Sequence, residues 1–598
     1  MRVLLTALFL TTVTFAIGQN AKLAQRYYND GEYEKAASLY EKLYAANPRN
    51  DYYFDRFTSC LFQLEEYDQA EKVIKKQLKA FPQNVRLYVT YGKLYENQYL
   101  DEKADEMYEL AINRLTNNKY QITKLANIFT SNSKYDLAIR TYEKGADLLK
   151  DKQVFAYNLG ELYRRKGDSE LMIEQYLNSL EANPQRMGTL RTIFQRYLSE
   201  DDFKILQTQL YARIQEKRNA LYYPELLAWV FIQNKDYKGA LRQVRAIDRR
   251  LKENGQRIFQ LAEIAANDND YDAAIAAYDY IVEEKGTTSS YYIDAKRESL
   301  RCRRYRLTEG YDYQQSDLEE LEQMYETFLN EFGKSKETGQ IIIEFAELEA
   351  LYLNDLDKAI SLLSELIEMP GLNTYIQSNA KLDLADCYLI KGEIWEATLL
   401  YSQVDKLYKD DLLGHEARYR NAKLSYFNGD FQWAQSQFDI LKASTSKLIA
   451  NDALDLSVFI MDNLGLDTTT RALGLYAEGE LLVFQNRFDE AFAKMDTLTQ
   501  EFPDHSLQDD IAYLKAGIFV KQRDYEQAIS YYQNILDNHR EEIRADNALY
   551  ALAQLYEKQL DDKAKAMELY EKLFIEFNSS VLAVEARKRF RLLRGDDV

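Results

Sequence analysis

Apolar residues recur along the first half of the chain at a fixed spacing of 34 residues. Every position at this spacing from residue 36 to residue 274 is apolar, and six of the eight are alanine: Ala36, Ala70, Ala104, Ala138, Met172, Leu206, Ala240 and Ala274. Four residues after each of these stands a tyrosine or an aliphatic residue, from Tyr40 in the first unit to Tyr278 in the eighth. A fixed period of this length indicates one supersecondary unit stacked many times.

The residue types in these columns predict pairs of helices. A third column, twelve residues before the alanines, is small in most units, as at Ala24 and Gly92. Small residues let two helices cross closely, and large aromatic residues fill the space between neighbouring units. Glycines such as Gly31 and Gly167 mark the turn within a unit, and Pro48 stands where one unit ends and the next begins. The pattern predicts an all-α chain folded as an α-solenoid.

The second half of the chain follows a different period. Residues 287–340 have a helical pattern that does not match the first series, which predicts a joint. A second series of alanines then begins, spaced mostly by 37 or 38 residues: Ala359, Ala397, Ala434, Ala491, Ala528 and Ala566. One spacing of 57 residues predicts an extra helix near 444–467. We therefore expect two arrays, at 19–286 and 341–598, the second ending in a capping helix.

The first series resembles the tetratricopeptide repeat, a helix–turn–helix unit with small residues near its eighth and twentieth positions and proline near its thirty-second. Two units carry the resemblance most fully, through Ala24, Gly31, Ala36, Tyr40 and Pro48 in the first and Gly160, Gly167, Tyr176 and Pro184 in the fifth. The resemblance covers roughly residues 19–285. It implies a helical solenoid that binds other proteins on its concave surface.

The C-terminal units resemble those of two bacterial envelope families. Phe502-Pro503-Asp504-His505-Ser506 and Phe577-Asn578-Ser579-Ser580 are similar to segments of the periplasmic coordinator of the Tol–Pal system and, more loosely, of the outer-membrane-protein assembly lipoprotein. The match covers about the last 100 residues. It implies an envelope location and protein partners among envelope or outer-membrane components.

The charge balance narrows the classes of partner. The chain has 96 acidic and 76 basic residues and a net charge of −20. Nucleic-acid binding needs clustered cations that neutralise phosphates, and anionic membranes attract basic surfaces, so we expect neither kind of partner. No stretch after the N-terminal segment approaches the ~20 apolar residues of a membrane-spanning helix, so no direct membrane insertion is expected.

The N-terminal segment has the pattern of a secretory signal peptide. Arg2 precedes the apolar run Val3–Phe15, and Ala16-Ile17-Gly18 places small residues at the cleavage positions. We expect residues 1–18 to be removed and the chain to cross the inner membrane. The predicted location is the periplasm, with association with the outer membrane through partners.

The sequence offers little chemistry for catalysis. It has three histidines, none with the helical spacing of a zinc site, and no glycine-rich phosphate loop. Four aspartates follow part of a calcium-loop template, but Ala273 stands where the turn needs glycine, so they are expected to begin a helix instead: Asp268, Asp270, Asp272 and Asp279. Cys60, Cys302 and Cys387 lie in apolar helical patterns and are expected to be buried thiols. We predict no metal, no cofactor and no enzymatic activity.

The candidate binding site is the concave groove. In the family resembled, this surface is formed by the second, fifth, ninth and twelfth positions of each first helix. Here those positions in units five to eight hold Tyr157, Glu161, Arg164, Arg191, Gln195, Trp229, Phe259 and Glu263. Exposed aromatic residues and arginine are enriched at binding hot spots. The basic run Arg301–Arg306 is expected to pair mainly with neighbouring acids, although it also suits an acidic partner segment.

Two functions fit these patterns. The first is a non-catalytic scaffold or adaptor of the periplasm or cell envelope that holds partner proteins on its concave surface. The alternative is a substrate-binding subunit that holds a glycan or peptide through groove aromatics such as Trp229. Repeat solenoids offer long binding surfaces for both, so the fold does not decide between them.

Overall fold

The structure is a computed structural model that describes residues 19–310, 313–443, 446–464 and 470–596. All regular secondary structure in these ranges is helical. The segment expected to be a signal peptide lies outside the described residues. Contacts divide the chain into two compact units, residues 1–253 (unit 1) and 254–598 (unit 2), and each is described by itself.

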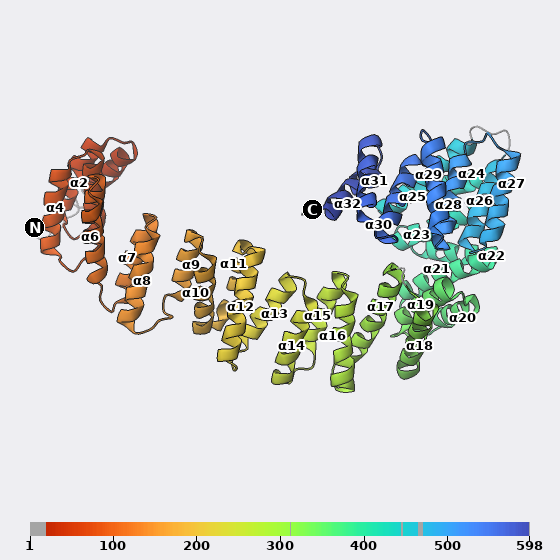
Figure 1. Ribbon diagram of the computed structural model, residues 1–598, viewed down its shortest axis with the longest axis horizontal. Coiled ribbons are helices and arrows are strands. Elements are labelled where there is room, and N and C mark those ends of the chain that lie inside the picture. The colour runs from red at the N-terminus through yellow and green to blue at the C-terminus, as the bar shows by residue number, and fades with distance from the viewer. Residues whose placement is uncertain (1–18, 311–312, 444–445, 465–469, 597–598) are drawn as a thin grey trace, which may run out of the picture. The chain divides into compact units, whose positions relative to one another are not determined.

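Unit 1 is a row of helices in which most pack against the next helix along the chain (Figure 1). Residues 19–29 are helical. The helices that follow are α2 (Tyr33–Ala46), α3 (Asp51–Gln63), α4 (Tyr67–Ala80), α5 (Val85–Asn97), α6 (Asp101–Asn113), α7 (Lys119–Ser131), α8 (Tyr135–Leu149), α9 (Ala156–Lys166), α10 (Ser169–Ala182), η1 (Pro184–Arg186), α11 (Met187–Tyr197), α12 (Glu200–Glu216), α13 (Tyr222–Gln233) and α14 (Tyr237–Leu251).

The repeat columns of unit 1 form its core. All seven of their alanine-column side chains are fully buried or nearly so: Ala36, Ala70, Ala104, Ala138, Met172, Leu206 and Ala240. At Gly92 of α5, an added Cβ would lie 2.4 Å from the ring of Tyr108 on α6. At Gly160 of α9, it would lie 2.8 Å from the ring of Tyr176 on α10. The small column therefore exists because a tyrosine ring of the second helix lies directly against the backbone of the first.

Unit 2 continues with helical pairs and adds two π-helical turns, η2 and η4. Its elements are α15 (Gln256–Asn267), α16 (Tyr271–Tyr280), η2 (Ile281–Lys285), η3 (Gly286–Thr288), α17 (Tyr292–Gly310), α18 (Gln315–Phe332), α19 (Gly339–Leu348), η4 (Glu349–Leu353), α20 (Leu356–Ile367), α21 (Thr374–Lys391), α22 (Ile394–Leu407), α23 (Leu412–Phe427), α24 (Phe431–Leu441), α25 (Lys447–Leu464), α26 (Arg471–Phe484), α27 (Phe488–Glu501), α28 (Gln508–Lys521), α29 (Tyr525–Asn538), α30 (Ala545–Lys558), α31 (Lys563–Glu576) and α32 (Leu582–Arg594).

The division between the units differs from the boundary expected near residue 286. It falls at Glu253 and Asn254 because α16 packs closely on α17, which joins the last unit of the 34-residue series to the helices that follow. The helix α25 occupies the segment in which the 57-residue spacing predicts an extra helix. The six alanines of the second series are all fully buried.

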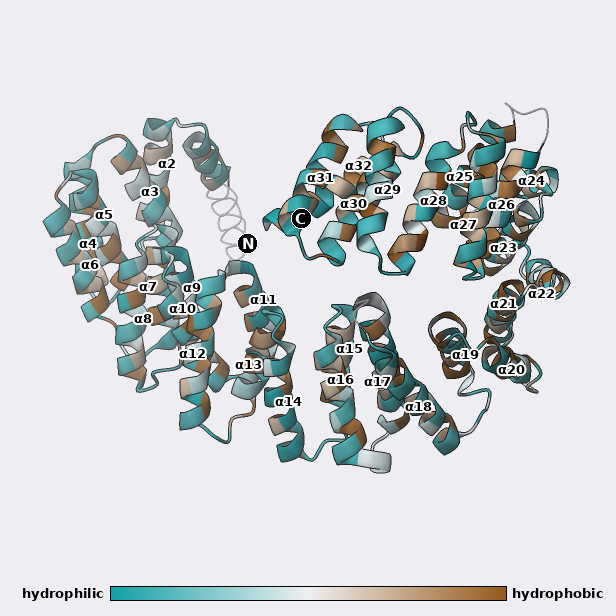
Figure 2. Ribbon diagram, turned by 45° about the vertical axis from the view of Figure 1, so that its right-hand side comes forward, coloured by the Kyte–Doolittle hydropathy of each residue, from teal (hydrophilic) through white to brown (hydrophobic). Residues whose placement is uncertain are grey.

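Both units are built from amphipathic helices, as the mixture of hydrophobic and hydrophilic residues along each helix in Figure 2 shows. Unit 2 also contacts itself across long sequence separations. The Gln485 side chain donates a hydrogen bond of 3.0 Å to the carbonyl of Leu389, and the Arg523 guanidinium lies 4.8 Å from the Tyr313 ring centre. The first contact joins the end of α21 to the turn after α26, and the second joins the segment after α17 to the turn after α28.

Candidate functional site

The predicted groove residues of α9 are half-buried and form a tight polar cluster. Glu161 accepts two hydrogen bonds from Arg164, at 2.7 and 2.9 Å, and a third from the Tyr176 hydroxyl at 3.3 Å. The bonds from Arg164 hold the pKa of Glu161 below its usual range. The Tyr157 ring meets the Tyr176 ring edge-on at 5.6 Å. Much of the bonding capacity of these side chains is thus already used within the fold.

Cation–aromatic pairs connect α9 to the next helical pair. The Arg164 guanidinium lies 4.3 Å from the ring centre of Tyr197 on α11, and Arg186 lies 4.9 Å from that of Tyr157. Tyr197 is 44% exposed, so an arginine–tyrosine pair is presented to solvent. The predicted residue Gln195, on the same helix as Tyr197, is exposed.

Two further predicted residues of unit 1, Arg191 and Trp229, contact neighbouring helices. Arg191 donates a hydrogen bond of 3.3 Å to the backbone carbonyl of Glu225. Trp229 on α13 is half-buried, and its ring centre lies 6.1 Å from that of Phe203 on α12. Trp229 is thus partly covered by the neighbouring helix, and its place in a binding groove stays a prediction.

Phe259 and Glu263, the predicted residues of unit 2, line a hollow of about 820 Å³. Phe259 packs between Tyr278 and Tyr291, with ring centres 5.3 and 5.2 Å away. The other charged residues of the hollow come from α17: Asp294, Arg297 and Glu298. Arg297 pairs with both of its acidic neighbours, so the hollow is acidic overall.

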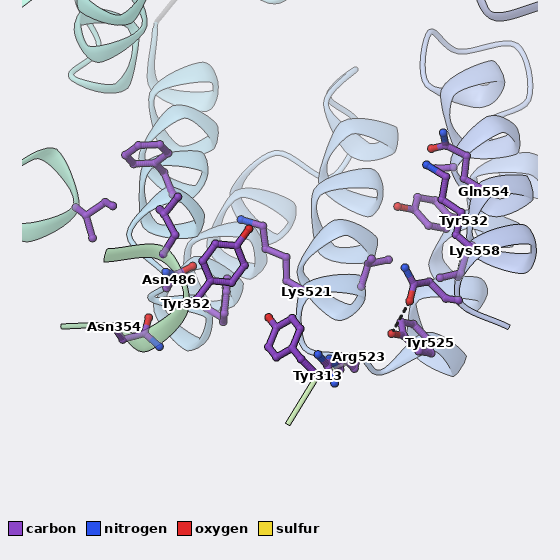
Figure 3. A pocket seen from close by; sticks show the side chains of 18 residues that line it. Tyr313, Tyr352, Asn354, Asn486, Lys521, Arg523, Tyr525, Tyr532, Gln554 and Lys558 are labelled. Carbon is purple, nitrogen blue, oxygen red and sulfur yellow. Dashed lines mark hydrogen bonds between the residues drawn. The ribbon is translucent and has the colours of Figure 1, made fainter. Parts of the chain in front are cut away.

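A larger cleft of about 1020 Å³ lies in unit 2 and was not predicted (Figure 3). Its walls come from the turn after α17, from η4, from the end of α21, and from α26 to α30. Aromatic residues line it, among them Tyr313, Tyr352 and Phe484, together with the amides of Asn354 and Asn486. The Tyr525 hydroxyl donates a hydrogen bond of 3.1 Å to Gln559 at its edge.

The cleft is basic. Its charged lining residues are Lys521, Arg523 and Lys558, and no aspartate or glutamate stands among the described residues that line it. Although Lys521 has a solvent-exposed side chain, partial desolvation by the surrounding helices and the nearby Lys423 cation lower its pKa. These residues come from segments spread over more than 200 positions of sequence, and no local motif joins them. Only the long-range packing of unit 2 brings them together.

A second polar network lies between packed helices of unit 2, on α21, α23 and α28. Arg420 of α23 contacts Asp386 at 2.6 Å, Glu416 at 2.7 Å and Asp383 at 3.6 Å. Desolvation raises the pKa of Asp383 to about 7, and the nearby carboxylate of Glu347 adds to the rise. A similar pair joins Arg544 to Asp510 at 2.5 Å. The charged groups of this network pair with one another within unit 2.

The basic run Arg301–Arg306 pairs with neighbouring acids, which confirms that expectation. Its ion pairs include Arg301–Glu298 at 3.0 Å, Arg301–Glu344 at 2.7 Å, Arg303–Asp279 at 2.6 Å, Arg304–Glu347 at 2.5 Å and Arg306–Asp272 at 2.9 Å. Two of the calcium-template aspartates are thus ion-paired. A third, Asp270, caps α16 by accepting from the Ala273 amide at 3.0 Å.

No cluster of metal-ligating side chains occurs among the described residues. Cys60, Cys302 and Cys387 are free, buried thiols, as expected, and burial raises the pKa of Cys60 to about 11. Among the described helices, none combines the length and apolar character that crossing a bilayer requires.

Comparison with known families identifies the repeat. Models described as tetratricopeptide repeat match residues 21–85, 155–186 and 513–579, so both units carry matches. A TPR repeat-containing protein of Methanocaldococcus jannaschii is 25% identical over 223 residues, which are 37% of this chain and 36% of that relative. The chain therefore spans about a third of that relative's length. The resemblance of the C-terminal units to the Tol–Pal coordinator has no counterpart in these matches.

Several solved structures align with the chain at low similarity. A complex titled Naa15/Naa10 bound to HypK-THB aligns over 97% of this chain and 94% of that one, with 15% identity and a TM-score of 0.27. A tetratricopeptide repeat protein of Parabacteroides merdae covers 47% of this chain and 91% of its own, at 11% identity and a TM-score of 0.28. Yeast Tom70 covers 96% and 99%, at 12% identity and a TM-score of 0.25.

Proposed function

Because the chain is a tetratricopeptide-repeat protein, we propose that it is a non-catalytic scaffold or adaptor that holds partner proteins of the bacterial cell envelope. The observation that carries this proposal is the presentation of arginine–tyrosine pairs by the first helices α9 and α11 of unit 1. Such residues are enriched at the centres of protein interfaces. Stacked repeats supply a long surface on which an extended partner can lie.

The envelope location rests on the N-terminal pattern. The apolar run and the Ala16-Ile17-Gly18 motif support export and cleavage before Gln19. N-terminal sequencing of the chain purified from its own cells tests this, and Gln19 is the expected first residue. An intact Met1 would contradict export by this route.

A glycan- or peptide-binding subunit is the second candidate. Tyr197 and Tyr157 present partly exposed rings beside arginines, an arrangement that also suits sugar rings or peptide side chains. The two functions differ in what co-purifies with the chain. Membrane proteins that stay bound through purification support the scaffold, whereas binding of soluble sugars by the isolated chain supports the alternative.

The interface is tested by substitutions that leave the core intact. Gln195→Ala with Tyr197→Ala removes exposed side chains from α11, and Gln215→Ala with Tyr211→Ala removes the same residue types from exposed positions of α12. Capture of envelope proteins, measured by quantitative mass spectrometry, is expected to fall about tenfold for the first pair, since a tenfold loss corresponds to about 1.4 kcal/mol. The second pair should change it less than about twofold.

Circular dichroism accompanies each capture experiment. Unchanged helicity and melting temperature are expected for both pairs because neither removes a core residue. Equal capture by the two variants would place the interface elsewhere on the chain.

A further inference from the structure

The cations of the cleft in unit 2 are exceptions in an acidic protein. Arg420, Arg544 and Lys358 each lie within 2.8 Å of a carboxylate oxygen. In contrast, no carboxylate of the described chain lies within 4.0 Å of the charged nitrogens of Lys521, Arg523 or Lys558. All three side chains are exposed to solvent. Positive charge that the protein itself leaves uncompensated is available to a ligand.

We propose that this cleft binds an extended acidic polypeptide segment of a partner protein. The inference rests on the proposed scaffold function and specifies the chemistry of one of its partners. Charge complementarity is the first argument. A cleft with three cations and no acids, in a chain of net charge −20, attracts an acidic segment while the rest of the surface repels it. The segment is thereby guided to this position.

The uncharged lining suits a polypeptide. The amides of Asn354, Asn486 and Gln554 provide donors and acceptors that can pair with the peptide groups of an extended chain. The rings of Tyr313 and Tyr352 offer apolar faces with a polar hydroxyl for the side chains between the acids. In Figure 3 these groups are distributed along the cleft and do not converge on one point.

The size and charge placement disfavour a small anion. The volume of about 1020 Å³ stands at the upper end of the range of roughly 300–1,000 Å³ found for small-molecule sites. Lys521 and Arg523 lie at the end of α28 and in the turn after it, whereas Lys558 lies at the end of α30, so the cations come from two separate segments. A phosphate group needs converging donors, whereas a peptide with several carboxylates can reach each cation in turn.

Fluorescence anisotropy with the full chain tests the proposal. The probe is a labelled peptide of repeating Asp-Glu-Tyr-Gly units, compared with an uncharged peptide of repeating Asn-Gln-Tyr-Gly units. The cleft variant carries Lys521→Gln, Arg523→Gln and Lys558→Gln. The control variant carries Lys406→Gln, Lys409→Gln and Lys588→Gln, which removes the same charge from exposed positions outside the cleft.

The acidic peptide is expected to bind the wild type and the control variant equally. The cleft variant should bind it at least about tenfold more weakly, the loss expected when three exposed charge contacts are removed. The uncharged peptide should bind none of the three proteins measurably. Equal loss in both variants overturns the proposal, because it shows a response to net charge alone. Tighter binding of oligothymidylate than of the acidic peptide also overturns it.

Failure here is distinct from failure of the scaffold function. If the acidic peptide does not bind but the chain still captures envelope proteins through α11, the cleft assignment is wrong and the scaffold stands. Loss of helicity in the cleft variant is checked by circular dichroism. If the triple variant unfolds, the single substitution Lys558→Gln, at an exposed position, is used instead and should also weaken binding of the acidic peptide.

Discussion

Acidic side chains have different surroundings in the two units. In unit 1, Glu71 accepts a hydrogen bond from Lys75 and Glu161 accepts from Arg164, and these partners lower the pKa of each glutamate. In unit 2, desolvation raises the pKa of Asp383, Asp510 and Glu349 to about 7. Each unit has exceptions: burial raises the pKa of Glu143 in unit 1, and hydrogen bonds from lysines lower the pKa of Glu331 and Glu365 in unit 2.

The difference follows from how the helices are packed. In unit 1, the hydrogen bond that Glu71 or Glu161 accepts from its cation outweighs desolvation, so the charged form is favoured. In unit 2 the chain contacts itself across the turns after α21 and α26, and the acids face other acids as well as arginine. The repeat is the same, but closer packing in unit 2 turns surface ion pairs into a buried network.

Removing one arginine from each unit gives the largest expected contrast. Arg420→Ala leaves Asp383 and Asp386 without their cation and should lower the free energy of unfolding by about 2–4 kcal/mol, below the upper range for fully buried pairs because about a quarter of the Arg420 side chain is exposed. Arg164→Ala affects one half-buried glutamate, Glu161, which keeps its ion pair with Arg165 at 3.2 Å, so it should cost at most about 1 kcal/mol. Urea unfolding monitored by circular dichroism measures both. Similar costs would contradict the contrast.

Adding one methyl group to each unit gives a smaller contrast. Gly92→Ala forces a Cβ to 2.4 Å from the rigid ring of Tyr108, so we expect a destabilisation of about 1–3 kcal/mol. Gly479→Ala places a Cβ near the flexible end of Met495, which can move away. Because alanine favours a helix by about 0.5–1 kcal/mol over glycine, Gly479→Ala should be neutral or stabilising. A Gly92→Ala variant as stable as the wild type would show that Tyr108 does not pack as described.

The smallest expected contrast is in how the stability of each unit changes in mild acid. The raised groups of unit 2 bind protons in the folded state between about pH 4 and pH 7 but not in the unfolded state, so their contribution to stability grows as the pH falls through this window. The lowered groups of unit 1 stay charged down to about pH 4.5, and their contribution is lost only below that.

Hydrogen exchange at pH 7 and pH 5, corrected for intrinsic rates, measures this difference. Protection of α21, α23 and α28 should rise at pH 5 by about 1–2 kcal/mol, while that of α5 and α9 should stay nearly constant. Asp383→Asn with Asp510→Asn should remove the rise in unit 2. Equal responses of the two units would contradict the assigned surroundings.

The fold could be predicted from the sequence because each repeat packs locally. The alanine column, Gly92 and Gly160 all report contacts between helices adjacent in the chain, and the structure places them in those contacts. The basic run Arg301–Arg306 was predictable for a related reason, since the acids it meets lie on adjoining helices.

The candidate site was less predictable. Position within the repeat indicated Trp229 as a groove residue, but the covering of its ring by Phe203 depends on how one pair of helices leans on the next. The cleft of unit 2 joins Tyr313 to Lys558 through long-range packing that has no period in the sequence. The feature that marks the cleft is a group of three cations with no acid among the described lining residues, and this group can be recognised only in the folded structure.

Photocrosslinking from single positions tests the claim that partners bind to the first helices. A photoreactive phenylalanine analogue is placed at Gln195 of α11 or Lys558 of α30, and at Lys144 of α8 or Glu571 of α31 on the second helices as controls. All four positions are exposed in the structure. The account predicts crosslinked partner proteins from Gln195 and Lys558 and few or none from the two controls. Crosslinks from Lys144 and Glu571 alone would contradict it.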